Sequence, residues 1–184
     1  MKKLHLLLPF LLLLLLASCT KDTPNPLPAE TRDWLAPEFS TTRTFYSELD
    51  EEDLMQITVK NHSKYSVKKN VINYQAVTIN FESQKQNLHL EVEGYDTTIK
   101  LTSKADPGEP RVTIAQGHYY TYQGFDREYF PDFQLLGNNI QFVEKVVNVS
   151  PTATSIKEFY YAKNAGLIGY KTSDGKLWSW LKTK

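Results

Sequence analysis

The sequence predicts a mainly β protein, either one antiparallel β-sandwich or a curved, partly closed sheet of about eight or nine strands, with at most one short helix. Apolar and polar residues alternate strictly in two segments, VTINF at 77–81 and LHLEVE at 88–93, which is the period of a strand with one buried face. No segment shows a long helical period. The connections are too short to contain crossover helices, so antiparallel pairing is expected.

The remaining elements follow from the same patterns. Further strands are expected at 55–59, 98–102, 111–115, 141–149, 156–162, 167–172 and 176–181. Ile79, Leu90 and Leu101 should be buried, whereas Thr78, His89 and Lys100 should be exposed. Turns are expected at 94–96 and at Asp174-Gly175, a pair that favours a tight hairpin. The helix candidate is 45–56, because an acidic cluster at 47–53 is typical of a first helical turn.

The first residues predict export. Two lysines precede an apolar run at 4–17, which is the pattern of a secretory signal and is shorter than the about 20 residues of a membrane-spanning helix. The run ends at Leu16-Ala17-Ser18-Cys19, and Cys19 is the protein's one cysteine. This motif resembles the lipobox of bacterial lipoproteins. The resemblance implies that the signal at 1–18 is removed and that Cys19 carries the lipid that holds the protein on the membrane.

The residues after the cysteine bear on location. Thr20 replaces the aspartate that retains such lipoproteins in the inner membrane, so the resemblance implies the outer membrane. Lys21-Asp22 partly resembles the surface-export signal of Bacteroidetes lipoproteins, which implies outward display, although a location facing the periplasm stays open. Asp96-Thr97-Thr98 resembles the O-glycosylation motif of that group, which makes Thr97 a candidate for modification.

The chain divides into three parts. After the signal, the segment 19–31 contains three prolines and reads as a lipidated tether of up to about 37 Å, at about 3.1 Å per residue. Residues 32–184 then form one β domain. Basic and acidic residues are balanced at 21 each, so the chain lacks the basic surface that nucleic acid requires.

The end of the chain carries a second resemblance. An aromatic strand at 159–161 leads through a small-residue corner to Gly166-Leu167, and a last strand follows with Trp178 and Trp180. This order is similar to the end of many Bacteroidetes lipoproteins of unknown function. The resemblance implies no catalytic residues.

Motifs for catalysis, phosphate binding and metal binding are missing. The sequence has no Gly-rich phosphate loop, no Gly-x-Ser-x-Gly elbow and no His-Glu-x-x-His pair. His62, His89 and His118 lie too far apart in sequence to form a local metal pair. We therefore expect no enzyme, no cofactor and no metal.

One aromatic segment, 118–133, is the candidate ligand site. Its rings and carboxylates are the mixture that a glycan site uses, and the candidate residues are Tyr119, Tyr120, Tyr122, Phe125, Asp126 and Glu128. The same rings could instead cover the open end of the β core. Both interpretations are open at this point.

Three classes of function follow. The first is a surface-displayed binding or assembly module for a glycan or an envelope protein. The second is a carrier of apolar ligands, lipocalin-like or lipoprotein-carrier-like, which requires an empty apolar interior of several hundred cubic ångströms. The third, an enzyme, has no supporting motif.

Overall fold

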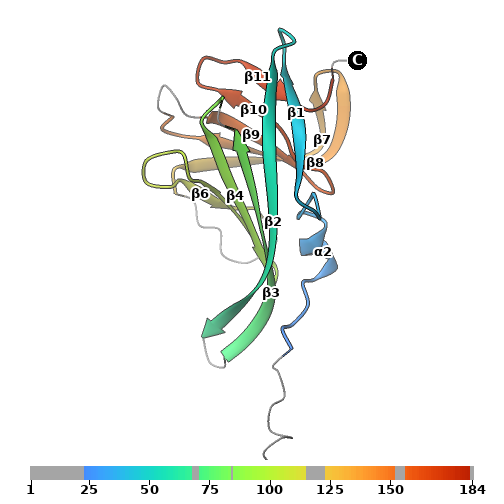
Figure 1. Ribbon diagram of the computed structural model, residues 1–184, viewed down its shortest axis with the longest axis vertical. Coiled ribbons are helices and arrows are strands. Elements are labelled where there is room, and N and C mark those ends of the chain that lie inside the picture. The colour runs from blue at the N-terminus through green and yellow to red at the C-terminus, as the bar shows by residue number, and fades with distance from the viewer. Residues whose placement is uncertain (1–22, 68–70, 84, 115–122, 152–155, 183–184) are drawn as a thin grey trace, which may run out of the picture.

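The structure is a computed structural model that describes residues 23–67, 71–83, 85–114, 123–151 and 156–182. It contains one short helix, α2 (Ala29–Arg32), and a single antiparallel sheet (Figure 1). In chain order the strands are β1 (Thr41–Ser47), β2 (Glu52–Val67), β3 (Val71–Ser83), β4 (Leu88–Tyr95), β5 (Thr98–Ser103), β6 (Arg111–Thr113), β7 (Phe125–Leu135), β8 (Asn138–Asn148), β9 (Ile156–Ala162), β10 (Gly166–Thr172) and β11 (Leu177–Ser179).

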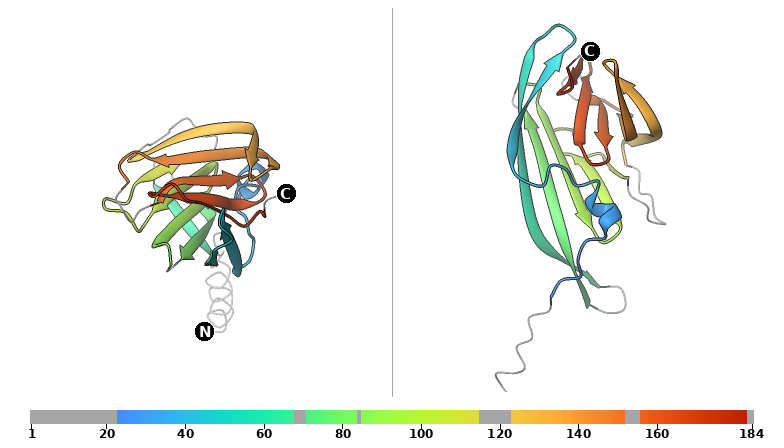
Figure 2. Two further views of the ribbon diagram at one scale, coloured as in Figure 1. Left: turned by 90° about the horizontal axis from the view of Figure 1, so that it is seen from above. Right: turned by 90° about the vertical axis from the view of Figure 1, so that its right-hand side faces the viewer.

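The sheet curls until its two ends meet. The strand order is β6-β5-β4-β3-β2-β1-β11-β10-β9-β8-β7, and the outermost strands β6 and β7 come together where Arg111 and Gln123 exchange two backbone hydrogen bonds of 2.7 and 3.0 Å. In Figure 2 the strands β2 to β5 form one wall and the strands β7 to β11 form the other. The result is a nearly closed, barrel-like sheet, which confirms the predicted fold class.

The number of strands is eleven, rather than eight or nine. The two missed strands are β1 and β7. The predicted helix at 45–56 is wrong, because this segment forms the end of β1, a turn and the start of β2. The Ser47 hydroxyl accepts hydrogen bonds of 3.1 Å from the N–H groups of Leu49 and Glu51, and Asp50 takes a positive φ of 58°. These local bonds stabilise a turn at the expense of a helix.

The core fills the inside of the curl. Ile79, Leu90 and Leu101 are fully buried, as the alternation predicted, whereas Thr78, His89 and Lys100 are half-buried rather than exposed. Aromatic rings occupy much of the interior. The pairs with centroids 5.6 to 6.4 Å apart are Phe45 with Tyr170, Tyr170 with Trp178, Phe81 with Tyr161, and Phe125 with Phe159.

A smaller cluster lies outside the curl. Leu135, Val143, Tyr160, Ala162 and Ile168 are buried there, and partly buried residues that include Phe133 and Trp180 pack against them. The rings of Phe133 and Tyr160 stack with their centroids 5.5 Å apart. This cluster packs β7 and β8 against the outer side of β9 and β10.

Both expected turns form, but the first lies at 96–97 rather than 94–96, because Gly94 and Tyr95 belong to β4. Asp96 has a positive φ of 49° between β4 and β5, and Gly175 has one of 89° between β10 and β11. Thr97 is exposed in the first of these turns. Within the described residues, no helix is long and apolar enough to cross a membrane.

Candidate functional site

The segment before β1 crosses one end of the curled sheet. Leu35 packs against Gly94 so closely that a Cβ at that glycine would lie 2.5 Å from Leu35 Cδ1. The hydroxyl of Thr31 donates a hydrogen bond of 2.7 Å to the carbonyl of Asp96. These contacts fix residues 24–39, which we call the arch, across the end of the core.

The arch begins earlier than the predicted domain boundary at residue 32. Asn25 lies beside β3, where its N–H donates to Asn73 O and its carbonyl accepts from Gln75 N–H, both at 2.8 Å. Leu27 is 6 % exposed and belongs to the main core cluster. Of the tether expected at 19–31, the residues from Asn25 onward are therefore packed on the sheet.

A groove lies between the arch and the concave face of the long β2–β3 hairpin. Its volume is about 620 Å³. The residues that line it are Pro24, Leu27, Arg32, Leu35, Glu38, Phe39, Val59, Asn61, His62, Ser63, Gln75, Ala76 and Val77. This volume lies within the range of about 300 to 1,000 Å³ that is usual for ligand sites.

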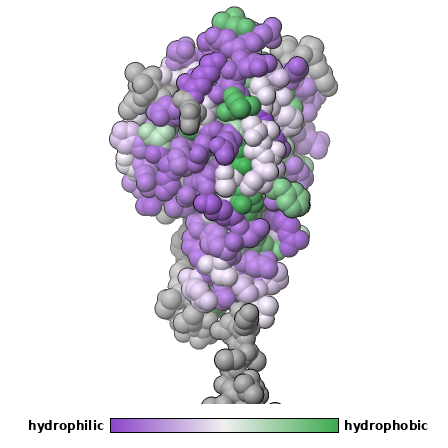
Figure 3. Space-filling view, viewed as in Figure 1, coloured by the Kyte–Doolittle hydropathy of each residue, from purple (hydrophilic) through white to green (hydrophobic). Residues whose placement is uncertain are grey.

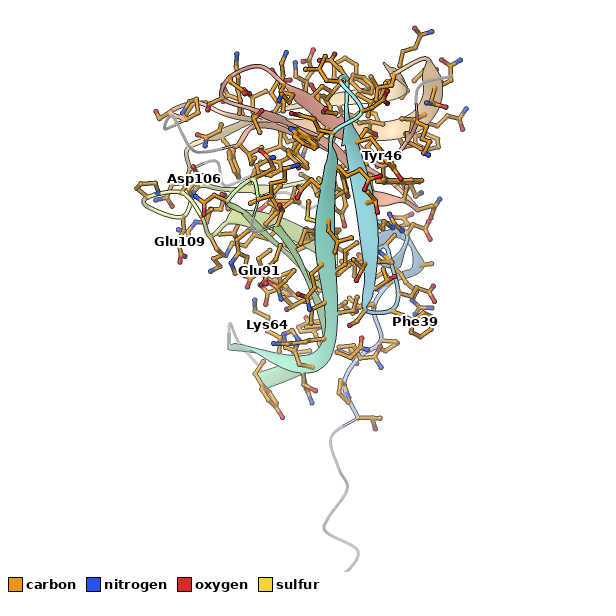
Figure 4. The ribbon with its side chains drawn as sticks, turned by 45° about the horizontal axis from the view of Figure 1, so that its top comes forward. Phe39, Tyr46, Lys64, Glu91, Asp106 and Glu109 are labelled. Atoms are coloured by element: carbon orange, nitrogen blue, oxygen red, sulfur yellow. The ribbon has the colours of Figure 1, made fainter. Side chains whose placement is uncertain are left out.

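The groove combines apolar and polar groups. Leucine and valine side chains supply the apolar part, and Asn61, Ser63 and Gln75 supply hydrogen-bonding groups. Phe39 is 77 % exposed, the largest exposed fraction among the large hydrophobic residues that the structure describes. Figure 4 shows Phe39 beyond the lower end of β1, with Lys64 on the opposite side of β2. A ligand with an apolar face and hydrogen-bonding groups would match this lining.

The opposite face of the same hairpin is polar. Lys64 Nζ lies 2.7 Å from Glu93 Oε2 and 3.9 Å from the centroid of the Tyr95 ring, and His62 Nε2 lies 3.9 Å from Glu93 Oε1. In Figure 3 the surface around β2 is largely hydrophilic, with hydrophobic residues in small separate groups. The concave face carries the apolar residues Val59 and Val77 together with the polar Asn61 and Ser63.

The aromatic segment predicted as the ligand site is only partly described. Tyr119, Tyr120 and Tyr122 lie outside the described residues. Phe125 is 1 % exposed and meets the Phe159 ring edge-on at 5.8 Å. Its ring therefore belongs to the core and offers no face on which a sugar could stack.

The two predicted carboxylates stay at the surface. Asp126 and Glu128 are exposed on β7, and Glu128 Oε2 lies 4.0 Å from Lys145 Nζ. They line a pocket of about 390 Å³ together with Arg127 and Val147. Because this lining contains no aromatic ring among the described residues, it lacks the stacking platform of the predicted glycan site.

Asp53 and Glu144 are two of the carboxylates that are buried among the described residues. Asp53 is 1 % exposed and accepts hydrogen bonds from the hydroxyls of Ser83 and Tyr170. Burial, followed by the hydrogen bond to Asp53, raises the pKa of Tyr170. Ser83 lies on the neighbouring strand β3 and Tyr170 lies on β10, which is not paired with β2, so this network ties β2 to the other wall of the curl.

The second buried group is Glu144. Its Oε1 lies 3.1 Å from Arg127 Nη2, and its buried Oε2 has no hydrogen-bond partner among the described residues. Burial raises the pKa of Glu144 to about 7, and Arg127 opposes this rise. The Arg127 guanidinium also donates to the carbonyl of Thr113 at 3.1 Å, which links β7 to β6 beside the closure of the sheet.

Metal ligands do not gather in the described part of the chain. No group of three or more histidine, cysteine, aspartate or glutamate residues lies close enough there to hold a metal ion.

The sequence analysis did not predict the groove, although the residue pattern of β2 indicates one of its walls. Met55, Ile57 and Val59 face the core, and the same face then continues with Asn61 and Ser63. A change from apolar to polar residues at constant period indicates that a strand leaves the core while it continues. The other wall, the arch, could not be read from any local pattern.

No family model matches the chain, and neither a curated protein nor a solved structure is significantly similar to it.

Proposed function

We propose that this chain is a lipid-anchored protein of the outer membrane, displayed at the surface, that acts as a binding or assembly module through the groove between the arch and the β2–β3 hairpin. The lipobox at Cys19 supports the anchor. The groove supports the binding role, because its volume is usual for a ligand site. It also has apolar lining residues and an exposed aromatic ring, that of Phe39.

The position of the first described residues gives the groove a place relative to the anchor. Figure 1 shows that the described chain begins beside the β2–β3 hairpin, at the end of the molecule opposite the C-terminus. Thr23 follows Cys19 by only four residues, which span at most about 14 Å when fully extended. With a lipid on Cys19, the groove lies at the membrane end of the domain.

The carrier alternative lacks an observation in its favour. The interior that it requires is occupied in the described residues by the large rings of Phe45, Tyr161, Tyr170 and Trp178, each at most 1 % exposed. The groove is instead open to the surface beside the core.

The anchor is tested by labelling cells with a fatty-acid analogue. The wild-type protein should be labelled, and the Cys19→Ser variant should not, since the thiol is the site of the first lipid. Equal labelling of the two proteins would contradict the anchor.

The groove is tested with two matched variants of the full-length protein. Phe39 and Leu49 are similarly exposed, at 77 % and 73 %, but only Phe39 lines the groove. Glycan and peptide arrays should give ligands whose binding is lost in Phe39→Ala and retained in Leu49→Ala, with unchanged melting temperatures. Equal binding by both variants would show that the ligand site lies elsewhere.

A further inference from the structure

The β2 strand has an open edge beside the groove. Its neighbour β1 pairs with it only as far as Ile57, whereas β2 continues to Val67. The N–H of Val59 donates to the Ser40 hydroxyl at 2.9 Å, and the chain then leaves β2. From Lys60 to Tyr65, no other described segment pairs with this edge (Figure 1).

The hydrogen bonds of β2 and β3 define which backbone groups of β2 point away from β3, toward the open edge. The Val59 N–H points to Ser40 and therefore away from β3. Backbone groups of every second residue point to the same side of a strand, so those of Asn61, Ser63 and Tyr65 also point away from β3. Their N–H and C=O groups form a row along the open edge.

Strand β3 gives an independent check of this direction. Asn73 and Gln75 bond to Asn25 and so point away from β2. Tyr74, between them, must then face β2, where its register partner is Lys64. Lys64 thus bonds inward to β3, and its neighbours Ser63 and Tyr65 point outward.

We propose that this edge binds an extended polypeptide segment of a partner protein, which adds a strand to the sheet beside residues 61–65. This inference rests on the proposed function and names the ligand class of the groove. Strand addition supplies affinity through backbone hydrogen bonds and specificity through alternate side chains.

The other edge of the hairpin already holds a chain in this manner. Asn25 makes two backbone hydrogen bonds of 2.8 Å to β3 beyond the point where β4 ends its pairing. The hairpin is therefore shaped to accept extended chain at its free edges. A glycan lacks the regular row of alternating donors and acceptors that this edge presents.

The two faces of the hairpin define the chemistry of the segment. On the concave side, every second side chain of an added strand would enter the groove beside Val59 and the exposed ring of Phe39. On the other side, its side chains would lie beside Lys60 and His62, which are both exposed. The segment should therefore alternate between apolar and acidic or polar residues.

A second copy of the chain fits this edge less well. Two copies that paired through the same edge would run antiparallel and would point their hairpin ends in opposite directions. The chain enters at the hairpin end, where Asn25 bonds to Asn73 and Gln75, so lipid anchors in one membrane cannot reach both copies in that arrangement. A separate partner at the membrane surface meets no such conflict.

The test uses the full-length protein in detergent and an arrayed library of about ten-residue peptides that alternate apolar with acidic or polar residues. The matched variants are Ser63→Pro, which removes one outward N–H, and Ser63→Ala, which keeps it. Proline is tolerated where an edge N–H faces solvent, so both variants should melt near the wild-type temperature. Wild type and Ser63→Ala should bind selected peptides, and Ser63→Pro should bind them at least about tenfold more weakly.

Peptides that carry N-methyl groups on alternate amides provide a second readout that needs no protein variant. Methylation in one of the two registers should abolish binding, because it blocks the donors that face β2. The inference is overturned if no library peptide binds, or if Ser63→Pro and methylated peptides bind as well as their controls. A glycan that binds through Phe39 without any peptide would overturn the inference but retain the proposed function. If neither glycans nor peptides bind through Phe39 or Ser63, both the inference and the proposed function are overturned. A dimer that is lost in Ser63→Pro would overturn the inference and identify the edge as a self-association surface.

Discussion

Replacing Glu144 with glutamine should remove a pH dependence of folding that is built into the core. Glu144 is 2 % exposed, and one of its oxygens finds no hydrogen-bond partner in the part of the chain that the structure describes. Among the described residues, its cationic contact is the Arg127 guanidinium at 3.1 Å, which also donates to the carbonyl of Thr113. Burial therefore outweighs the ion pair, and the pKa of Glu144 rises from 4.5 to about 7.

The sign of the effect follows from proton linkage. Between pH 4.5 and about 7 the folded chain holds a proton on Glu144 that the unfolded chain has lost, so stability falls as pH rises through this interval. One pH unit corresponds to about 1.4 kcal/mol, so the whole interval amounts to about 3 kcal/mol. This stability is present in full below the unfolded pKa and is lost above the folded one.

The contribution of Glu144 to the free energy of unfolding can be measured by urea unfolding. The wild type and Glu144→Gln are compared at about pH 4 and about pH 8. Other groups titrate equally in both proteins, so the difference between them isolates Glu144. The variant should match the wild type at the acidic pH and exceed it by about 3 kcal/mol at the alkaline pH. A variant that is less stable than the wild type at the alkaline pH would show that the bond to Arg127 outweighs burial.

Three further substitutions test the packing. Leu90→Ala, at a fully buried position, should lower the free energy of unfolding in urea by about 2 to 5 kcal/mol. Alanine at half-buried positions on the outer face should lower it far less. Equal losses would contradict a strand with one buried face. Gly166→Ala should cost more than about 2 kcal/mol, because φ is 73° and the new Cβ would lie 2.0 Å from the Ala36 carbonyl oxygen; a neutral result would exclude that close approach. Tyr170→Phe should cost about 1 to 3 kcal/mol, because buried Asp53 loses a donor; an unchanged unfolding midpoint would contradict the role of this bond.

The sequence patterns predicted the fold class because alternation survives wherever one face of a strand is buried. Strands β9 and β10 were predicted to within about one residue at each end. Strand β1 was missed because Phe45 is its one buried large side chain and an acidic turn follows. Strand β7 was missed because Pro131 lies in its middle and its aromatic residues are distributed over both faces.

The closure of the sheet and the groove could not be predicted, because both depend on contacts between distant segments. Closure rests on the backbone hydrogen bonds between Arg111 of β6 and Gln123, which comes just before β7. Strands β6 and β7 are the two ends of the strand order. The groove needs the arch, and the proline-rich composition of that segment indicates only an extended chain. Its path over Gly94 is set by Leu35, whose role appears only once β4 is in place.

The residues of the long β2–β3 hairpin protect its open edge and shape the groove beside it. A strand that outlasts its neighbour by several residues leaves backbone groups unpaired, and such an edge invites aggregation unless polar or charged residues protect it. Here Asn61 and Ser63 keep the extension polar on the concave face, and Lys60 and Lys64 keep it charged on the other. Apolar side chains line the groove around Phe39, Val59 and Val77, and Tyr65 and Ile72 are exposed farther along the hairpin. An edge protected in this way resists unspecific pairing. Under the proposed function, it would admit only a strand whose alternate side chains fit the groove.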